Sequence, residues 1–308
     1  MTIQTATDEA TAAFREAQQR VLDRYQVPAQ SRFVDVPSLG GRAQVLATGE
    51  GPPLPMVIGG ALPAVFWAPL MAKLSDHTLY AIELPGNGLT DRARYHHATF
   101  RRTAVAYLAD ILDALDIGPG PFVTQSMGSL WTTWLAWEHP GRVRSQVMIA
   151  CPAFFLDTSA ILPWRLLSIP TLGTLLVSLW KPSATGAEQI IRMVGEDPAG
   201  LDEIRDVMVA GQRMPHRRQD VVELMRSVMS WTRPRPEVAV TAALLRTITH
   251  PVRLIWGEQD GFGSPEAGRR AVEHMPDADL HVMPGGHAPW LHRAGQVAAL
   301  THEFLDTH

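Results

Sequence analysis

Short apolar runs alternate with helical patterns along the first half of the chain. The runs of strand character cover residues 32–36, 43–47, 55–58, 78–83, 122–125 and 145–150. Between the later runs, residues 65–73, 99–115 and 127–138 carry apolar side chains at helical spacing. Because such alternation builds a mostly parallel central sheet with helices on both faces, the pattern predicts an α/β fold.

The pattern changes after Cys151. Residues 152–246 show only helical periodicity, and strand-like runs resume at residues 252–256 and 280–283. A helical block between strands of one sheet is expected to cover the edge of the sheet where ligands bind. We therefore predict an α/β core of residues 1–151 and 247–308 and an inserted helical cap of residues 152–246.

The first part of the predicted core is an N-terminal helical extension, residues 1–30. Within it, residues 8–25 have the pattern of an amphipathic helix that precedes the first strand. The pattern fits packing on the core and binding of a partner equally well.

Residues 161–180 form an apolar stretch with some likeness to a membrane span. Two prolines, a glycine and Arg165 divide it into pieces shorter than the roughly 20 apolar residues that a spanning helix requires. We expect short apolar helices that face a pocket, and no stable membrane insertion. The first residues lack the basic start and apolar run of a signal peptide, which favours a cytoplasmic protein.

Composition narrows the classes of function. Of the 308 residues, 46% are hydrophobic and 19% are charged, so the chain can bury a large core. A net charge of -4 without long blocks of one sign offers no basic surface for nucleic acid. The single cysteine, Cys151, excludes an intrachain disulfide and a cysteine-based metal cluster. We expect no metal and no cofactor, and the sequence leaves a homodimer open.

One apolar run ends in a candidate nucleophile. Residues 122–125 lead directly into Ser126, and Gly128 follows two positions later. A serine on a sharp strand-to-helix turn needs small residues two positions before and after it, because the backbone there is crowded and strained. Gly128 meets this requirement, whereas Thr124 stands where a glycine is usual. On this motif alone, Ser126 is equally a nucleophile or a cap of the following helix.

Other loops after predicted strands carry complementary chemistry. In an open α/β sheet, ligands sit outside the carboxyl ends of the strands, so these loops are expected to meet. Residues 59–63 (Gly-Gly-Ala-Leu-Pro) form a glycine-rich loop whose N–H groups could face an oxyanion. Residues 83–91 form a turn-rich loop without an obvious nucleophile. Residues 257–260 end in Asp260, and residues 284–290 contain His287 after two glycines.

These residues together resemble the α/β-hydrolase superfamily, in the form of a serine hydrolase with a helical cap. The resemblance covers residues 32–150 and 251–308 and the order nucleophile, acid, histidine. It implies a catalytic triad of Ser126, Asp260 and His287, and an oxyanion hole formed by the backbone N–H groups of Ala61 and Met127. The chain departs from the family pattern at Gly59, where histidine is frequent, and at Asn87, another histidine position.

Alternatives exist for the acid and the base. Glu258 and Asp157 are the other candidate acids, and Asp260 is preferred. His281 lies within a predicted strand, His292 on the next helix, and residues 96–97 (His-His) in an exposed loop, so each fits the base less well than His287.

The implied activity is hydrolysis of a carboxylic ester or lactone of a largely apolar small molecule through an acyl-enzyme on Ser126. A carbon–carbon bond hydrolase, an acyltransferase and a catalytically weak small-molecule-binding protein are the alternatives. A serine rather than an aspartate at the turn argues against haloalkane dehalogenases and epoxide hydrolases. The residues expected to contact substrate are Leu62, Phe155, Trp164 and Trp290.

Overall fold

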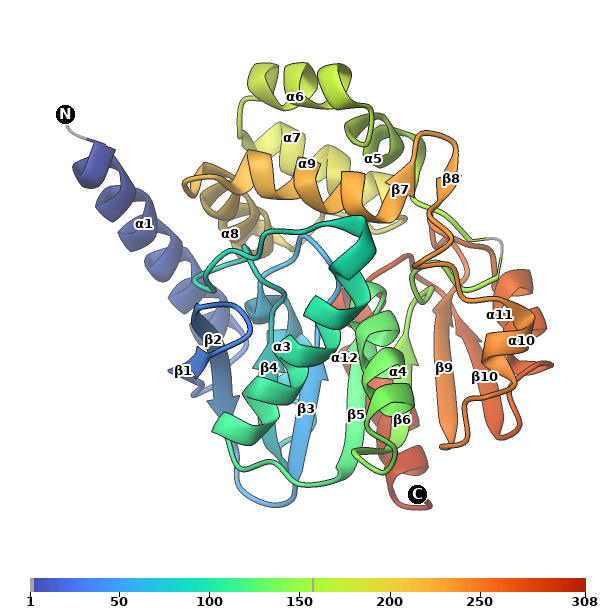
Figure 1. Ribbon diagram of the computed structural model, residues 1–308. Coiled ribbons are helices and arrows are strands. Elements are labelled where there is room, and N and C mark those ends of the chain that lie inside the picture. Colours follow the sequence, from blue (N-terminus) through green and yellow to red (C-terminus); the bar gives the residue numbers. More distant parts are fainter. Residues whose placement is uncertain (1–2, 157) are drawn as a thin grey trace.

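The computed structural model describes residues 3–156 and 158–308, with one eight-stranded sheet at the centre (Figure 1). Asp157, an alternative acid, lies outside the described residues. The strand order is β1-β2-β4-β3-β5-β6-β9-β10. Their bounds are β1 (Gln30–Val36), β2 (Gly41–Thr48), β3 (Pro53–Val57), β4 (Thr78–Ile82), β5 (Gly120–Gln125), β6 (Val143–Ile149), β9 (Val252–Gly257) and β10 (Ala278–Met283).

Strand direction follows the prediction. β2 pairs antiparallel with both β1 and β4. Every pair from β4 across to β10 is parallel. A mostly parallel sheet is therefore confirmed, and the carboxyl ends of its parallel strands meet at one edge.

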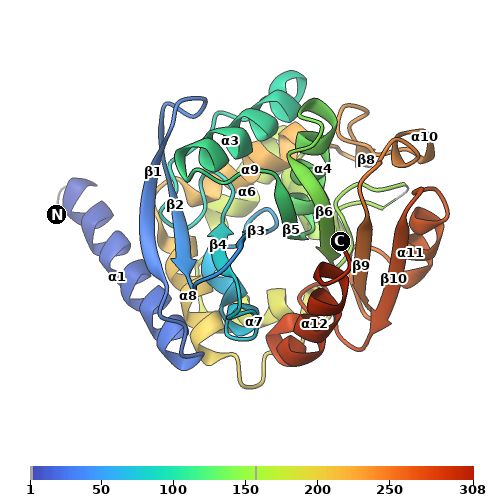
Figure 2. The ribbon, with the colours of Figure 1, turned by 90° about the horizontal axis from the view of Figure 1, so that it is seen from below.

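Helices cover both faces of this sheet (Figure 2). On one face lie α3 (Phe100–Ala114), α4 (Met127–Glu138) and α11 (Pro265–Val272), and Trp131 and Trp134 are buried beneath them. On the other lie η1 (Ala64–Trp67), α2 (Ala68–Met71) and α12 (Trp290–Leu305), with Trp67 and Trp290 in the core. Full burial of each such aromatic side chain stabilises the fold by roughly 1.5–3 kcal/mol.

A helical segment between β6 and β9 lies above the carboxyl edge of the sheet (Figure 1). It contains α5 (Leu162–Leu167), α6 (Pro170–Leu179), α7 (Ala184–Met193), α8 (Asp202–Arg213), α9 (Arg217–Val228) and α10 (Ala242–Leu245). The sequence predicted no strand here, but β7 (Met229–Ser230) and β8 (Arg233–Pro234) form a small antiparallel hairpin. Two residues per strand are too few to show a periodic pattern, which explains this difference.

The apolar stretch at residues 161–180 folds as α5 and α6, with Pro163 and Pro170 in their first turns. Trp164, Val177 and Trp180 line a cavity. Leu175 and Leu179 instead face outward, with 53% and 69% of their surfaces exposed, so only one face of these helices meets the expectation of a pocket wall. No helix in the described part of the chain is long and apolar enough to cross a membrane.

The N-terminal helix α1 (Ile3–Arg24) packs on the protein itself. Phe14, Val21 and Leu22 on its inner face are at most 2% exposed. The helix lies beside α8 of the cap, and Arg20 approaches Asp206 of that helix to 4.0 Å. The amphipathic pattern therefore reflects packing against both the core and the cap.

Candidate active site

Ser126 occupies a strained turn between β5 and α4. Its backbone has φ 52° and ψ -114°, a conformation that costs of order 1–3 kcal/mol for a residue with a side chain. A Cβ atom at Gly128 would lie 2.2 Å from the carbonyl oxygen of Val57, and one at Gly59 would lie 2.9 Å from the Cβ of Ser126. Both neighbours must therefore be glycine for this turn to pack against β3 and its loop.

Thr124 is accommodated although it stands at the usual glycine position. Its side chain is fully buried, and its hydroxyl donates to the carbonyl oxygen of Val147 at 3.1 Å. The same hydroxyl accepts from Nε2 of Gln146 and lies 3.0 Å from the hydroxyl of Ser129. Because the Thr124 hydroxyl has hydrogen-bond partners, the side chain packs beside the turn without an unpaired buried polar group.

Asp260 and His287 meet at the carboxyl ends of β9 and β10. Nδ1 of His287 lies 2.9 and 2.8 Å from the two carboxylate oxygens of Asp260. The carboxylate also accepts from the N–H groups of Cys151 (2.8 Å) and Phe262 (2.9 Å), so it is held in one orientation. The ring of Phe262 packs on the imidazole with a centroid distance of 4.2 Å.

The alternative acid and bases lie elsewhere. Glu258 is exposed and its carboxylate accepts from the side-chain amide of Gln259. His281 lies 3.5 Å from Asp279, and His292 contacts the carbonyl oxygen of Asp197. Residues 96–97 lie on the surface. Among the described residues, the pairing of a buried imidazole with a buried carboxylate at this edge is therefore that of His287 with Asp260.

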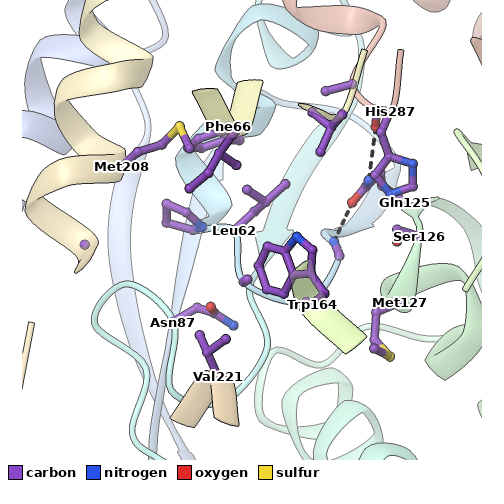
Figure 3. A pocket seen from close by; sticks show the side chains of 18 of the residues that line it. Leu62, Phe66, Asn87, Gln125, Ser126, Met127, Trp164, Met208, Val221 and His287 are labelled. Atoms are coloured by element: carbon purple, nitrogen blue, oxygen red, sulfur yellow. Dashed lines mark hydrogen bonds between the residues drawn. The ribbon is translucent and has the colours of Figure 1, made fainter. Parts of the chain in front are cut away.

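A cavity of about 200 Å³ lies between this edge of the sheet and the cap (Figure 3). Ser126, Met127 and His287 form part of its floor. The rest of the lining is mostly apolar and comes from several elements: Phe14, Leu62, Phe66, Phe154, Trp164, Val177, Met208, Val221 and Leu291. A partly buried nucleophile candidate and a buried imidazole thus line one largely apolar cavity.

Two of the four expected substrate contacts line this cavity and two do not. Leu62 and Trp164 are lining residues. Trp290 is instead buried in the core, where its indole N–H donates to the carbonyl oxygen of Phe66 at 2.7 Å. Phe155 is also a core residue, 1% exposed, and its neighbour Phe154 faces the cavity. The sequence correctly placed these aromatic residues after strands at this edge, but it did not predict which way each side chain points.

The glycine-rich loop after β3 is held from two sides. Gln125 accepts from the N–H of Gly59 at 2.8 Å and donates to the carbonyl oxygen of His287 at 3.1 Å, the second bond being visible in Figure 3. From the cap, the guanidinium of Arg217 donates to the carbonyl oxygen of Ala61 at 2.7 Å. Ala61 has φ 92°, so these bonds fix a strained loop. Sequence motifs did not reveal Arg217, since a single arginine in a helical cap carries no recognisable pattern.

The N–H groups expected to face an oxyanion belong to this region. Met127 is the first residue of α4, and the first N–H groups of a helix have no acceptor within it. Ala61 lies in the loop that Arg217 and Gln125 hold. Both residues line the cavity beside Ser126.

Glu83 connects the segment that follows the glycine-rich loop to the loop after β4. It is fully buried, and its carboxylate accepts from the N–H groups of Ala64 (2.9 Å) and Leu89 (3.0 Å). Burial raises the pKa of Glu83 to about 7, and these N–H donors oppose the shift only in part.

We expect Glu83 to make stability depend on pH. The unfolded carboxyl loses its proton near pH 4.5 and the native one near pH 7, so the native state binds more protons between these values. The free energy of unfolding, taken relative to Glu83→Gln, should therefore fall by about 3 kcal/mol as pH rises through this window. Urea unfolding of both proteins from pH 4 to 8 measures it; a pH-independent difference contradicts the prediction.

A possible ligand set for a metal lies far from the cavity. Among the described residues, Asp76, His77 and His302 place one side-chain ligand atom each within 4.8 Å of one another. His77 directly precedes β4, so the group lies at the amino end of the sheet, opposite Ser126. It therefore takes no part in the chemistry of the cavity.

The eight-stranded, mostly parallel sheet with helices on both faces is the fold of the α/β-hydrolase class. A family model described as the alpha/beta hydrolase family matches residues 45–300. The chain belongs to this family.

Curated relatives match over most of the chain. The pimeloyl-[acyl-carrier protein] methyl ester esterase of Xylella fastidiosa (strain 9a5c) is 25% identical over 276 residues, which cover 84% of this chain and 97% of the esterase. A 2-hydroxy-6-oxononadienedioate/2-hydroxy-6-oxononatrienedioate hydrolase of Burkholderia vietnamiensis is 27% identical over 289 residues, or 90% and 96% of the two chains.

Solved structures support the same fold. The carboxylesterase CesB (YbfK) from Bacillus subtilis superposes with a TM-score of 0.75 at 20% identity, and the match covers 96% of this chain and 98% of CesB. The 2-hydroxy-6-oxo-6-phenylhexa-2,4-dienoate hydrolase from Rhodococcus sp. strain RHA1 superposes with a TM-score of 0.73 at 20% identity, covering 91% and 100%.

Proposed function

We propose that this protein is a serine hydrolase that cleaves a carboxylic ester or lactone of a largely apolar small molecule. The observation that carries the proposal is the buried pairing of His287 with Asp260 at 2.8 Å, in a cavity that also exposes Ser126 on its strained turn. The name of the Xylella relative, a methyl ester esterase, supports ester chemistry.

The proposed mechanism assigns one role to each group. His287 takes the proton of the Ser126 hydroxyl, and the oxygen attacks the carbonyl carbon of the ester. The resulting oxyanion accepts from the N–H groups of Met127 and Ala61, each worth about 3 kcal/mol in the transition state. His287 then gives its proton to the leaving alcohol as the carbon–oxygen bond breaks. Water, deprotonated by His287, attacks the acyl-enzyme; the bond between the acyl carbon and the Ser126 oxygen then breaks, His287 returns the proton to that oxygen, and the acid is released.

Asp260 has a supporting role in this mechanism. Its carboxylate accepts from Nδ1–H of His287, which leaves the other ring nitrogen free to take a proton. It also stabilises the imidazolium that forms during each half of the reaction. The carboxylate itself keeps its charge throughout.

Hydrolysis of a carbon–carbon bond is the second candidate. The Burkholderia relative, at 27% identity, is named as a hydrolase of 2-hydroxy-6-oxo dienedioates and trienedioates, and these names contain no ester group, which favours carbon–carbon cleavage. Acyl transfer would use the same acyl-enzyme with an alcohol or amine in place of water. Methyl, p-nitrophenyl and lactone substrates, compared with vinylogous diketones, separate ester from carbon–carbon cleavage.

Labelling with a fluorophosphonate probe tests the proposal without any assumption about the substrate. Such a probe reacts with an activated serine, so we expect stoichiometric labelling of the native protein. Ser126→Ala and heat-denatured protein serve as controls and should remain unlabelled. Native protein that labels no faster than the denatured control would exclude an activated serine and favour a binding protein.

Trp164 is expected to shape acyl-chain preference. It lines the cavity from α5, so Trp164→Ala should raise KM for a p-nitrophenyl hexanoate roughly tenfold and that for the acetate much less. Leu176→Ala, on the exposed side of α6, is the matched control and should leave both constants unchanged. Equal changes for both substrates would show that Trp164 does not contact the acyl chain.

On the grounds of composition, we also propose a cytoplasmic protein without a nucleic-acid partner. Its net charge of -4 gives no electrostatic attraction to a polyanion. A homodimer stays a prediction that sedimentation can test.

A further inference from the structure

The turn between α7 and α8 lies directly against the loop that carries His287. Glu196 in this turn is 5% exposed, and its Oε1 accepts from the N–H of Gly286 at 2.7 Å and the N–H of Ala288 at 3.0 Å. These donors are the residues before and after His287. One carboxylate oxygen of the cap therefore holds both sides of the histidine.

Backbone contacts reinforce this attachment. The N–H of His287 itself donates to the carbonyl oxygen of Val194 at 2.8 Å. A Cβ atom at Gly195 would lie 2.1 Å from the carbonyl oxygen of Gln259, and one at Gly286 would lie 2.3 Å from that of Val194. Three successive N–H groups of the histidine loop thus end on the cap, and glycine on each side permits the close approach.

Burial of a carboxylate at this position costs free energy. It forms no ion pair within 4.0 Å among the described residues, and its burial raises the pKa of Glu196 against the opposing effect of the two N–H donors. The charged or titratable groups near it are His292 and Arg293 of α12, and His287 in the shared cavity. An apolar residue could fill this space equally well. What glutamate adds is an acceptor oxygen for the two N–H groups.

We propose that Glu196 is a positioning residue for His287. It holds the backbone of residues 286–288 so that the imidazole remains between Asp260 and Ser126, and it makes the cap part of the apparatus that aligns the base. The inference rests on the proposed role of His287. Misplacement of a reacting group by about 1 Å costs on the order of 100-fold in rate, so loss of this support should appear in kcat.

Two conservative variants separate the effect of side-chain length from the effect of charge. Glu196→Gln keeps the length and the acceptor oxygen but loses the charge, whereas Glu196→Asp keeps the charge but is one methylene too short to accept from both N–H groups. We expect kcat for a p-nitrophenyl ester to fall roughly 10- to 100-fold in Glu196→Asp and Glu196→Ala and only a few-fold in Glu196→Gln, with KM little changed throughout. The rate of fluorophosphonate labelling should fall in the same order.

Leu201→Ala provides the matched control for stability. Leu201 is 2% exposed near the start of α8 and is not among the residues that line the cavity. We expect this variant to lose thermal stability but to keep kcat. Wild-type kcat in Glu196→Asp, or a larger loss in Glu196→Gln than in Glu196→Asp, would overturn the positioning role. If Ser126→Ala retained activity, the proposed function itself would fail, which is a separate outcome.

Discussion

Ser126→Ala is expected to lower kcat/KM for a carboxylic ester by roughly 10⁴- to 10⁶-fold. The variant removes the hydroxyl that we propose forms the acyl-enzyme, while the N–H groups and the cavity remain and sustain a small residual rate. Alanine keeps the Cβ of Ser126, so the φ of 52° and the close packing at Gly128 and Gly59 are the same in the variant. Initial rates with a p-nitrophenyl ester, measured at high protein concentration, cover the required range.

Ser129→Ala is the matched control for this experiment. Ser129 lies one turn further along α4, fully buried, with its hydroxyl next to that of Thr124 and outside the cavity. We expect a modest loss of stability and nearly unchanged kcat. A residual activity of Ser126→Ala within about tenfold of the wild type would mean that another group is the nucleophile.

The edge of the sheet that carries the candidate site could be predicted because each of its parts follows a strand. Ser126, Asp260 and His287 lie in the turns after β5, β9 and β10, and the apolar runs predicted those strands to within two residues. Parallel strands bring their carboxyl ends together, so residues far apart in the sequence had to meet. Strand patterns therefore predicted that these loops meet, and the family resemblance implied which of their residues form the candidate triad.

The walls of the cavity could not be predicted in the same way. Phe154 and Phe155 are adjacent, yet only Phe154 lines the cavity, because the irregular backbone there, with φ 62° at Phe154, follows no periodic rule. Phe14 reaches the cavity from α1, more than one hundred residues away from Ser126 in sequence. Side-chain direction in loops and the packing of helices on one another depend on tertiary contacts that no local pattern records.

Side chains of the cap form hydrogen bonds with the loops at the carboxyl edge of the sheet. Arg217 donates to the carbonyl oxygen of Ala61, and Glu196 accepts from the N–H groups on either side of His287. Glu196 is buried and Arg217 is half-buried, and burial of such a polar group is costly unless it has a hydrogen-bond partner. The cap thus holds the loops of Ala61 and His287 as well as enclosing the cavity.

Asp260→Asn is expected to lower kcat by roughly 10⁴-fold. The amide cannot hold His287 in the required tautomer or stabilise its charged form. Its NH₂ group must also face either Nδ1 of His287 or the N–H groups of Cys151 and Phe262, all of which now donate to the carboxylate. Stopped-flow and steady-state rates with one ester measure the loss, and circular dichroism checks that the fold survives.

Glu258→Gln decides between the two described candidates for the acid. Glu258 is exposed two residues before Asp260, and its carboxylate accepts from the side-chain amide of Gln259, so its substitution should leave kcat within about twofold of the wild type. A large loss in Glu258→Gln together with an active Asp260→Asn would assign the acid to Glu258. That result would require the histidine loop to leave the position in which Glu196 and Val194 hold it, because the carboxylate of Asp260 lies 2.8 Å from the imidazole there.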